Sequence, residues 1–142
     1  MPIPCIDVVL KSGKKVFLFK RAYEPAKNKW WFVGGRILRD ETFEQAIKRK
    51  VKEEVGVDVN VVKMIGTYEE FFTTSRFDVN KKNKRKSGTH TLSICFVAEP
   101  KRKDFKLMLN DEYSDYKIIS KIEKNLDPYI KGVLKDSGLK LV

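Results

Sequence analysis

Residues 34–57 constrain the fold most, because a glycine pair precedes a segment with helical periodicity that ends in another glycine. Thr42 or Asp40 is suited to cap a helix, since short polar side chains accept hydrogen bonds from the free N–H groups of a first turn. Gly56 suits the left-handed conformation that ends a helix. We expect a helix running to about Glu54, with one apolar face made of Phe43, Ala46, Ile47 and Val51.

The chain on either side of this helix has the patterns of β-strands. Runs rich in β-branched and aromatic residues predict strands at 5–10, 15–21, 57–72 and 89–99, with a shorter one within 111–120. The first two form a candidate hairpin, and the third is expected to bend near Gly66. A second helix is expected after Asp127, with Pro128 in its first turn and Gly138 at its end. These elements predict an α+β fold, an α/β/α sandwich with a mixed sheet.

The length of 142 residues and the hydrophobic content of 42% suit one well-filled core, so we expect a single domain over 1–142. No apolar run reaches the roughly 18–20 residues that span a bilayer, and the first residues do not resemble a secretory signal. A cytoplasmic protein with no membrane partner is expected. Cys5 and Cys95 lack the spacing of a zinc site or a disulfide framework, and both are interpreted as buried thiols.

The charge of the chain favours an anionic partner. A formal net charge of +11 and a pI near 9.6 attract polyanions, including nucleotides, nucleic acid and anionic lipid. The basic residues are spread widely, with one dense run at 81–86 that we interpret as a solvated loop. A small nucleotide is therefore favoured over nucleic acid, which stays an alternative partner.

Carboxylates on the expected helix indicate a cation site. Lys50 precedes Glu53 by three residues and Glu54 by four, so it shares a helix face with both glutamates. Mg²⁺ prefers carboxylate and carbonyl oxygens together with phosphate oxygens of a substrate. The turn at Gly34 and Gly35 leaves a backbone carbonyl accessible for that purpose.

Glu41 and Arg49 can join the turn to the helix through a charge-assisted pair. The complete pattern is Gly35, five residues, Glu41, seven residues, Arg49, and then KVKEEVGV at 50–57. It resembles the Nudix box, G-x5-E-x7-R-E-U-x-E-E-x-G-U with U aliphatic, at every position except Lys50. The resemblance implies the Nudix fold and a hydrolase of a nucleoside diphosphate linked to another group. It also implies Mg²⁺, or Mn²⁺ in its place, held by Gly35, Glu53 and Glu54.

Lys50 replaces a glutamate that the family commonly uses as a metal ligand or base. The replacement removes one carboxylate and adds a positive charge beside the site. Lys50 can pair with Glu54 or bind a substrate phosphate itself, so that a single Mg²⁺ is expected. The group that deprotonates water is then expected outside the box.

A wider resemblance is carried by "KRAYEPAKNKWWFVGGRILRDET" at 20–42 and "LNDEYSDYKII" at 109–119. These stretches look like those of GDP-mannose mannosyl hydrolases, which also lack the box glutamate and attack a sugar carbon. The likeness implies diphosphate contacts for Arg21 and Arg36, with Arg36 also catalytic. It implies that Asp7 contacts the nucleotide or sugar and that Glu112 is a further metal ligand.

The catalytic base stays open between two residues. Tyr113 stands where these hydrolases have a histidine base, and a phenol with a pKa near 10 is a poor base at neutral pH. Glu53, which that branch does not keep, is the alternative. Attack at the sugar carbon is favoured over attack at phosphorus.

Two other functions remain alternatives to a nucleotide-sugar hydrolase. One is an enzyme that cleaves P–O–P bonds of nucleoside triphosphates or other diphosphate derivatives, and the other is a catalytically impaired module that binds nucleotide or RNA. We expect a homodimer. His90 is interpreted as structural, and at least one of Trp30 and Trp31 as a core residue.

Overall fold

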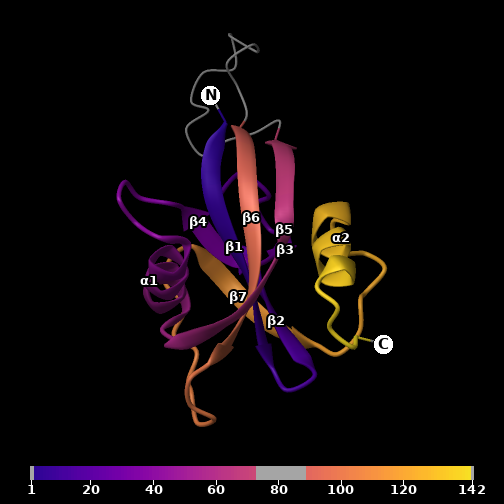
Figure 1. Cartoon of the computed structure of the whole chain (residues 1–142). Coiled ribbons are helices and arrows are strands. Elements are labelled where there is room, and N and C mark those ends of the chain that lie inside the picture. Colours follow the sequence, from indigo (N-terminus) through magenta and orange to yellow (C-terminus); the bar gives the residue numbers. More distant parts are fainter. Residues whose placement is uncertain (1, 73–88, 142) are drawn as a thin grey trace.

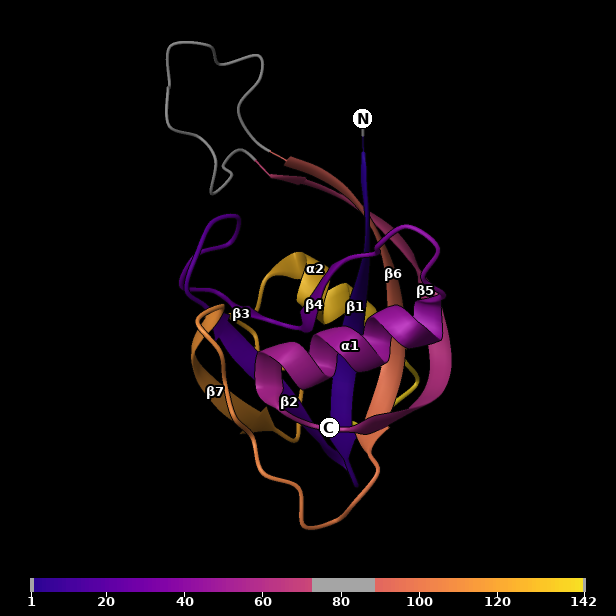
Figure 2. The ribbon, with the colours of Figure 1, turned by 90° about the vertical axis from the view of Figure 1, so that its left-hand side faces the viewer.

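A computed structural model describes residues 2–72 and 89–141 of the chain. Within these residues, seven strands form one sheet that lies between two helices (Figures 1 and 2). The strands are β1 (Ile3–Ser12), β2 (Lys15–Arg21), β3 (Trp30–Trp31), β4 (Val33–Arg36), β5 (Val59–Phe72), β6 (Thr89–Pro100) and β7 (Tyr113–Ile119). The helices are α1 (Phe43–Val55) and α2 (Pro128–Asp136). The predicted α/β/α sandwich is confirmed, and the basic run at 81–86 lies outside the described residues.

Strand β1 organises the sheet, because it pairs with β2 and β4 in antiparallel fashion and with β6 in parallel. The main strand order is β3-β2-β1-β6-β5, with β4 on β1 and β7 on β2. The predicted hairpin is confirmed by the pairing of Leu10 with Phe17. The register between β5 and β6 shifts between Met64 and Gly66, where the sequence predicted a bend.

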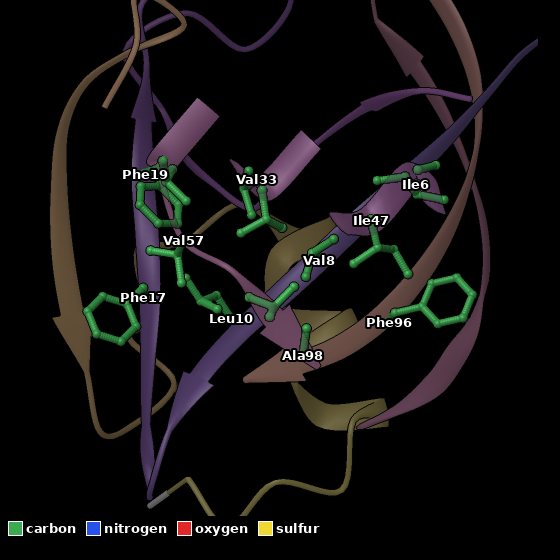
Figure 3. Close-up of a cluster of buried hydrophobic side chains, with 14 of the residues drawn as sticks. Ile6, Val8, Leu10, Phe17, Phe19, Val33, Ile47, Val57, Phe96 and Ala98 are labelled. Carbon is green, nitrogen blue, oxygen red and sulfur yellow. The ribbon is translucent and has the colours of Figure 1, made fainter. Parts of the chain in front are cut away.

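The alternation of β1 divides the core into two clusters. Ile6, Val8 and Leu10 are fully buried on the side of α1, where they join Ile47 and the cluster drawn in Figure 3. Val9 points to the opposite side and joins a cluster under α2. Both faces of β1 are therefore buried. Gly34 and Gly35, which the sequence predicted in a turn, instead lie in strand β4, where they pair with Asp7 and Ile6 of β1.

Helix α2 begins and ends close to the predicted residues. The Asp127 side chain accepts a hydrogen bond from the N–H of Tyr129, and Pro128 is the first helical residue. The helix is capped by Ser137, and Gly138 follows with a φ of 71°. None of the helices that the structure describes is long and apolar enough to cross a membrane.

The cysteines and tryptophans divide between core and surface. Cys95 is fully buried, as predicted, but Cys5 is only half-buried because its side chain lines a pocket at the sheet surface. The prediction of two buried thiols is thus wrong for Cys5. Trp31 is buried with 5% exposure, which confirms that at least one tryptophan belongs to the core, while Trp30 is half-buried.

Candidate active site

Helix α1 is fixed at both ends by the residues that predicted it. The Thr42 hydroxyl accepts from the Gln45 N–H at 3.1 Å, and the Gln45 side chain accepts from the Thr42 N–H at 2.9 Å. Gly56 closes the helix in the left-handed conformation with a φ of 75°. These caps satisfy N–H and C=O groups that a helix leaves free, so the orientation of the helical side chains is well defined.

The predicted pair of Glu41 and Arg49 joins the segment after β4 to helix α1. Arg49 Nε lies 2.6 Å from Glu41 Oε2, and a terminal guanidinium nitrogen lies 2.9 Å from Glu41 Oε1. The same terminal nitrogen donates to the backbone carbonyl of Arg36 at 3.1 Å. Because a bidentate guanidinium stabilises the carboxylate, the pKa of Glu41 falls to about 2. The pair holds Arg36 at the end of β4.

Glu54 is the buried carboxylate of the site, with 3% exposure. Its Oε1 accepts from the Tyr113 hydroxyl at 2.8 Å and from the Gly34 N–H at 3.3 Å. Its Oε2 lies 3.1 Å from Lys50 Nζ. Burial raises the pKa of Glu54, although Lys50 and the Tyr113 hydrogen bond act in the opposite direction. Glu54 is thus held by contacts from β4, β7 and its own helix.

Lys50 places a positive charge beside Glu54. Its ammonium contacts Glu54 and lies 3.9 Å from Glu53 Oε2, and its side chain is 17% exposed. The chain of Lys50 passes over Gly35, where an added Cβ would lie 2.6 Å from Lys50 Cε. The glycine therefore makes room for the lysine. Of the two roles predicted for Lys50, the structure shows the pairing with Glu54.

The expected metal ligands are not gathered around one point in this arrangement. Among the residues that the structure describes, no group of three acidic, histidine or cysteine side chains could hold a metal ion. Glu54 is already paired with Lys50, while Glu53 lies 3.4 Å from an Arg49 nitrogen. The Lys50 ammonium lies beside the buried carboxylate that the box predicts as a metal ligand. The set of Gly35, Glu53, Glu54 and Glu112 stays a prediction.

One pocket, of about 260 Å³, brings most of the predicted residues together. Its wall includes the side chains or backbone of Asp7, Arg21, Gly35, Arg36, Lys50, Glu54 and Glu112. Arg21 is positioned by a hydrogen bond of 2.6 Å from its Nε to the Pro25 carbonyl. The Ala22 N–H donates to the Glu112 carbonyl at 2.9 Å, which ties the end of β2 to the segment before β7. Glu53 and Tyr113 are not among the wall residues.

Tyr113 lies behind Glu54 rather than in the pocket. Its side chain packs against the ring of Phe19, with ring centroids 5.4 Å apart, and it is 5% exposed. Burial and the adjacent Glu54 raise the pKa of Tyr113 well above its ordinary value of 10.0. A phenol in this environment stays protonated at neutral pH, and its hydroxyl donates to Glu54. The catalytic assignment of Tyr113 stays a prediction, and the geometry suits a residue that positions Glu54.

Asp7 lies on the floor of the pocket and is 8% exposed. It accepts a hydrogen bond from the Tyr129 hydroxyl of α2. Burial, opposed by that hydrogen bond and by Arg21, raises the pKa of Asp7 to about 7. Gly34 must be a glycine beside it, because an added Cβ would lie 2.2 Å from the Ile6 carbonyl and 2.4 Å from Asp7 Oδ1.

Glu70 and Tyr129 are among the wall residues that were not predicted from the sequence. The alternation within 57–72 could have placed Glu70 on one face of its strand, but it does not say which face carries the pocket. His90 stays outside the pocket wall: its Nε2 lies 3.2 Å from Glu69 Oε2, and its ring stacks on Phe71 at 4.2 Å. These contacts agree with the structural interpretation of His90.

The fold and this site define a class of protein: an α/β/α sandwich in which a glycine-containing strand and a capped helix present a glutamate to a pocket lined by arginines. The chain belongs to the Nudix family, since the model of the NUDIX domain matches residues 1–131. The box resemblance and the Nudix fold are thereby confirmed.

The chain is similar to several known proteins. It is 31% identical over 134 residues to the low-salt glycan biosynthesis protein Agl8 of Haloferax volcanii, covering 94% of this chain and 81% of that protein. It is 33% identical over 98 residues to the ADP-ribose pyrophosphatase of Methanocaldococcus jannaschii, covering 69% of this chain and 51% of that protein. Among solved structures, the MutT NUDIX hydrolase of Burkholderia pseudomallei has a TM-score of 0.73 at 16% identity, covering 96% of this chain and 98% of that one. The last likeness concerns the fold alone.

Proposed function

We propose that this chain hydrolyses a nucleoside diphosphate linked to a sugar, with GDP-mannose as the first substrate to test. The observation that carries the proposal is the pocket, in which Arg21, Arg36 and Lys50 gather beside the buried carboxylates Asp7 and Glu54. Guanidinium groups bind phosphate oxygens through two parallel hydrogen bonds, so the two arginines suit a diphosphate.

The lining of the pocket supports a substrate with a part that is not phosphate. Its volume of about 260 Å³ is slightly below the range of roughly 300–1,000 Å³ of small-molecule sites, so the lining carries this argument. The wall also contains Trp31 and Phe72, whose ring centroids are 5.9 Å apart, and the small polar side chains of Thr91 and Ser93. Apolar rings beside a few polar groups suit a sugar or a base rather than a second phosphate. The similarity to a protein named for glycan biosynthesis supports the sugar.

The chemistry that we propose is attack of water on the sugar carbon, which releases free sugar and a nucleoside diphosphate. Arg21 and Arg36 would bind the diphosphate and offset the charge that develops on it as the bond breaks. Lys50 adds a third positive charge, and Glu54 and Tyr113 fix its position. Mg²⁺, with Mn²⁺ as the alternative, is the cofactor expected from the family, and we assign no step to it.

The test is a screen of nucleotide sugars, ADP-ribose and nucleoside triphosphates in the presence and absence of Mg²⁺, with identification of the products. Free sugar and nucleoside diphosphate are expected from GDP-mannose. Hydrolysis in ¹⁸O-labelled water should then place the label on the sugar. Label on phosphate would mean attack at phosphorus, with Glu53 as the candidate base.

One observation favours P–O–P cleavage as a second candidate. The chain is similar to an ADP-ribose pyrophosphatase over 98 residues, although these span only 51% of that protein. Release of a nucleoside monophosphate from GDP-mannose, in place of a nucleoside diphosphate, would establish this second activity and exclude the first. No product from any compound would indicate a module that binds nucleotides without hydrolysing them.

A further inference from the structure

Glu70, in β5, has a carboxylate oxygen without a hydrogen-bond partner. Its Oε1 is buried and accepts no hydrogen bond from the residues that the structure describes. The side chain lines the same pocket as Arg21, Arg36 and Lys50. A buried acceptor left unpaired costs free energy, so a donor from a bound molecule would relieve that cost.

Strand pairing places Glu70 on the pocket face of the sheet. Glu70 is paired with Thr91 of β6, which is paired in turn with Ile3 of β1, and all three side chains line the pocket. The next residue with the same orientation is Phe72, another wall residue. Glu69 and Phe71 point to the opposite face, where both contact His90. Adjacent glutamates of one strand thus face different surroundings.

The charges around Glu70 make its end of the pocket acidic. Burial, Asp127 and Asp7 raise the pKa of Glu70 to about 7, and Lys29 acts against them. The positive charge of Lys29 is shared between Glu70 and Asp127, since its ammonium lies 3.3 Å from Asp127 Oδ2. Arg21, Arg36 and Lys50 act instead on Cys5, whose pKa they lower against the effect of burial. The pocket therefore has a basic end near α1 and β4 and an acidic end at β5.

We propose that Glu70 accepts a hydrogen bond from a neutral donor of the substrate, foremost a sugar hydroxyl, and so determines which substrate the pocket takes. This inference rests on the proposed function for the identity of the substrate. A carboxylate repels phosphate, so Glu70 would also exclude the diphosphate from its own end and direct it toward the arginines. Trp31 and Phe72, which contact each other in the same wall, would pack against the rest of the sugar or base.

The experiment compares Glu70→Gln with the wild type in calorimetric binding of GDP-mannose and of GDP. Glutamine keeps the size of the side chain but removes the charged acceptor. Glu69→Gln is the matched control, because Glu69 is the adjacent residue, points away from the pocket and is exposed. UDP-glucose and UDP form a second ligand pair that shares the sugar hydroxyls but changes the base.

We expect Glu70→Gln to weaken binding of GDP-mannose at least about tenfold and to leave binding of GDP unchanged, since unpaired polar groups discriminate strongly between ligands. The control variant Glu69→Gln should bind both ligands as the wild type does. Equal weakening for GDP-mannose and GDP, without an effect on the UDP pair, would support the acceptor and assign its donor to the base. Unchanged binding of all four ligands, or no binding by the wild type, would overturn the proposal. A wild type that binds GDP-mannose but does not hydrolyse it would refute the proposed function alone.

A stability measurement checks that the variant folds and that Glu70 is buried as described. The pKa of a glutamate is about 4.5 in the unfolded chain and about 7 at this position. Ionisation of Glu70 therefore destabilises the fold progressively as the pH rises through that interval. Glu70→Gln should equal the wild type near pH 4.5 and be more stable above pH 7. A variant that is no more stable above pH 7 would contradict the burial of the unpaired Oε1 of the half-buried Glu70.

Discussion

Replacement of Lys50 by methionine tests the charge pair at the centre of the site. Methionine keeps much of the length of the side chain that passes over Gly35 but removes the ammonium beside Glu54. Glu54 would then be a buried carboxylate with hydrogen bonds from Tyr113 and Gly34 but without the positive charge of Lys50. We expect a clear loss of stability, because removing one partner leaves the other charge buried and uncompensated.

The magnitude follows from the separation and the burial of the two groups. Unit charges 3.1 Å apart attract with about 5 kcal/mol at an effective dielectric constant near 20. Desolvation of both groups offsets part of this energy, and the Lys50 side chain is 17% exposed. Glu54 can also limit the loss by taking up a proton. We therefore expect the free energy of unfolding to fall by about 2–3 kcal/mol at neutral pH.

Urea unfolding without divalent cations measures this loss, and the helix itself provides the control. Lys48 pairs with Glu44 at 2.9 Å with the same spacing, but the two side chains are 41% and 64% exposed. Lys48→Met should therefore lower the free energy of unfolding by about 0.5 kcal/mol or less. In a double-mutant cycle, the variant that carries both Lys50→Met and Glu54→Gln should regain much of the stability that Lys50→Met alone loses. Equal losses for the two methionine variants would refute the pairing of Lys50 with a buried Glu54.

Three further substitutions test the support of the site in the same unfolding assay. Tyr113→Phe removes the 2.8 Å hydrogen bond to Glu54 and should lower the free energy of unfolding by about 1.5–3 kcal/mol, the range for hydrogen bonds to charged groups. An unchanged free energy of unfolding would mean that the bond is absent. Gly34→Ala should destabilise severely, because its Cβ would lie 2.2 Å from the backbone oxygen of Ile6, and a folded variant of normal stability would contradict the close pairing of β1 and β4. Gly132→Ala, by contrast, places its Cβ in open space within α2 and should stabilise by about 0.5–1 kcal/mol; a loss there would mean that the helix face is covered.

The parts of the site that depend on local structure could be predicted from the sequence. The Thr42 cap, the glycine stop and the pairing of Glu41 with Arg49 all lie within one turn-helix segment, whose geometry follows from spacing. The position of Lys50 could be predicted only as a choice between two partners. That choice depends on the contact of its side chain with Gly35, which brings β4 and α1 together in space.

The acidic end of the pocket could not be predicted, because it depends on long-range pairing. A strand sequence shows that Glu69 and Glu70 point in opposite directions, but it does not show which neighbour strand or helix covers each face. The parallel pairing of β1 with β6 brings Ile3 and Cys5 beside Thr91 and Ser93. Tyr129 reaches Asp7 from α2, across 122 positions of the chain. No local pattern carries that information.

The two ends of the pocket bear together on where water attacks. In the proposed binding mode, a diphosphate at Arg21 and Arg36 and a sugar at Glu70 would place the bond between sugar and phosphate among the wall residues Cys5, Asp7 and Ser93. Glu53 is not part of that wall, and its carboxylate lies 3.4 Å from an Arg49 nitrogen and 3.9 Å from Lys50 Nζ. The proposed attack at the sugar carbon therefore relies on a base other than Glu53. The weakened binding of GDP-mannose by Glu70→Gln and the ¹⁸O label on the sugar are therefore expected together, because both follow from one orientation of the substrate.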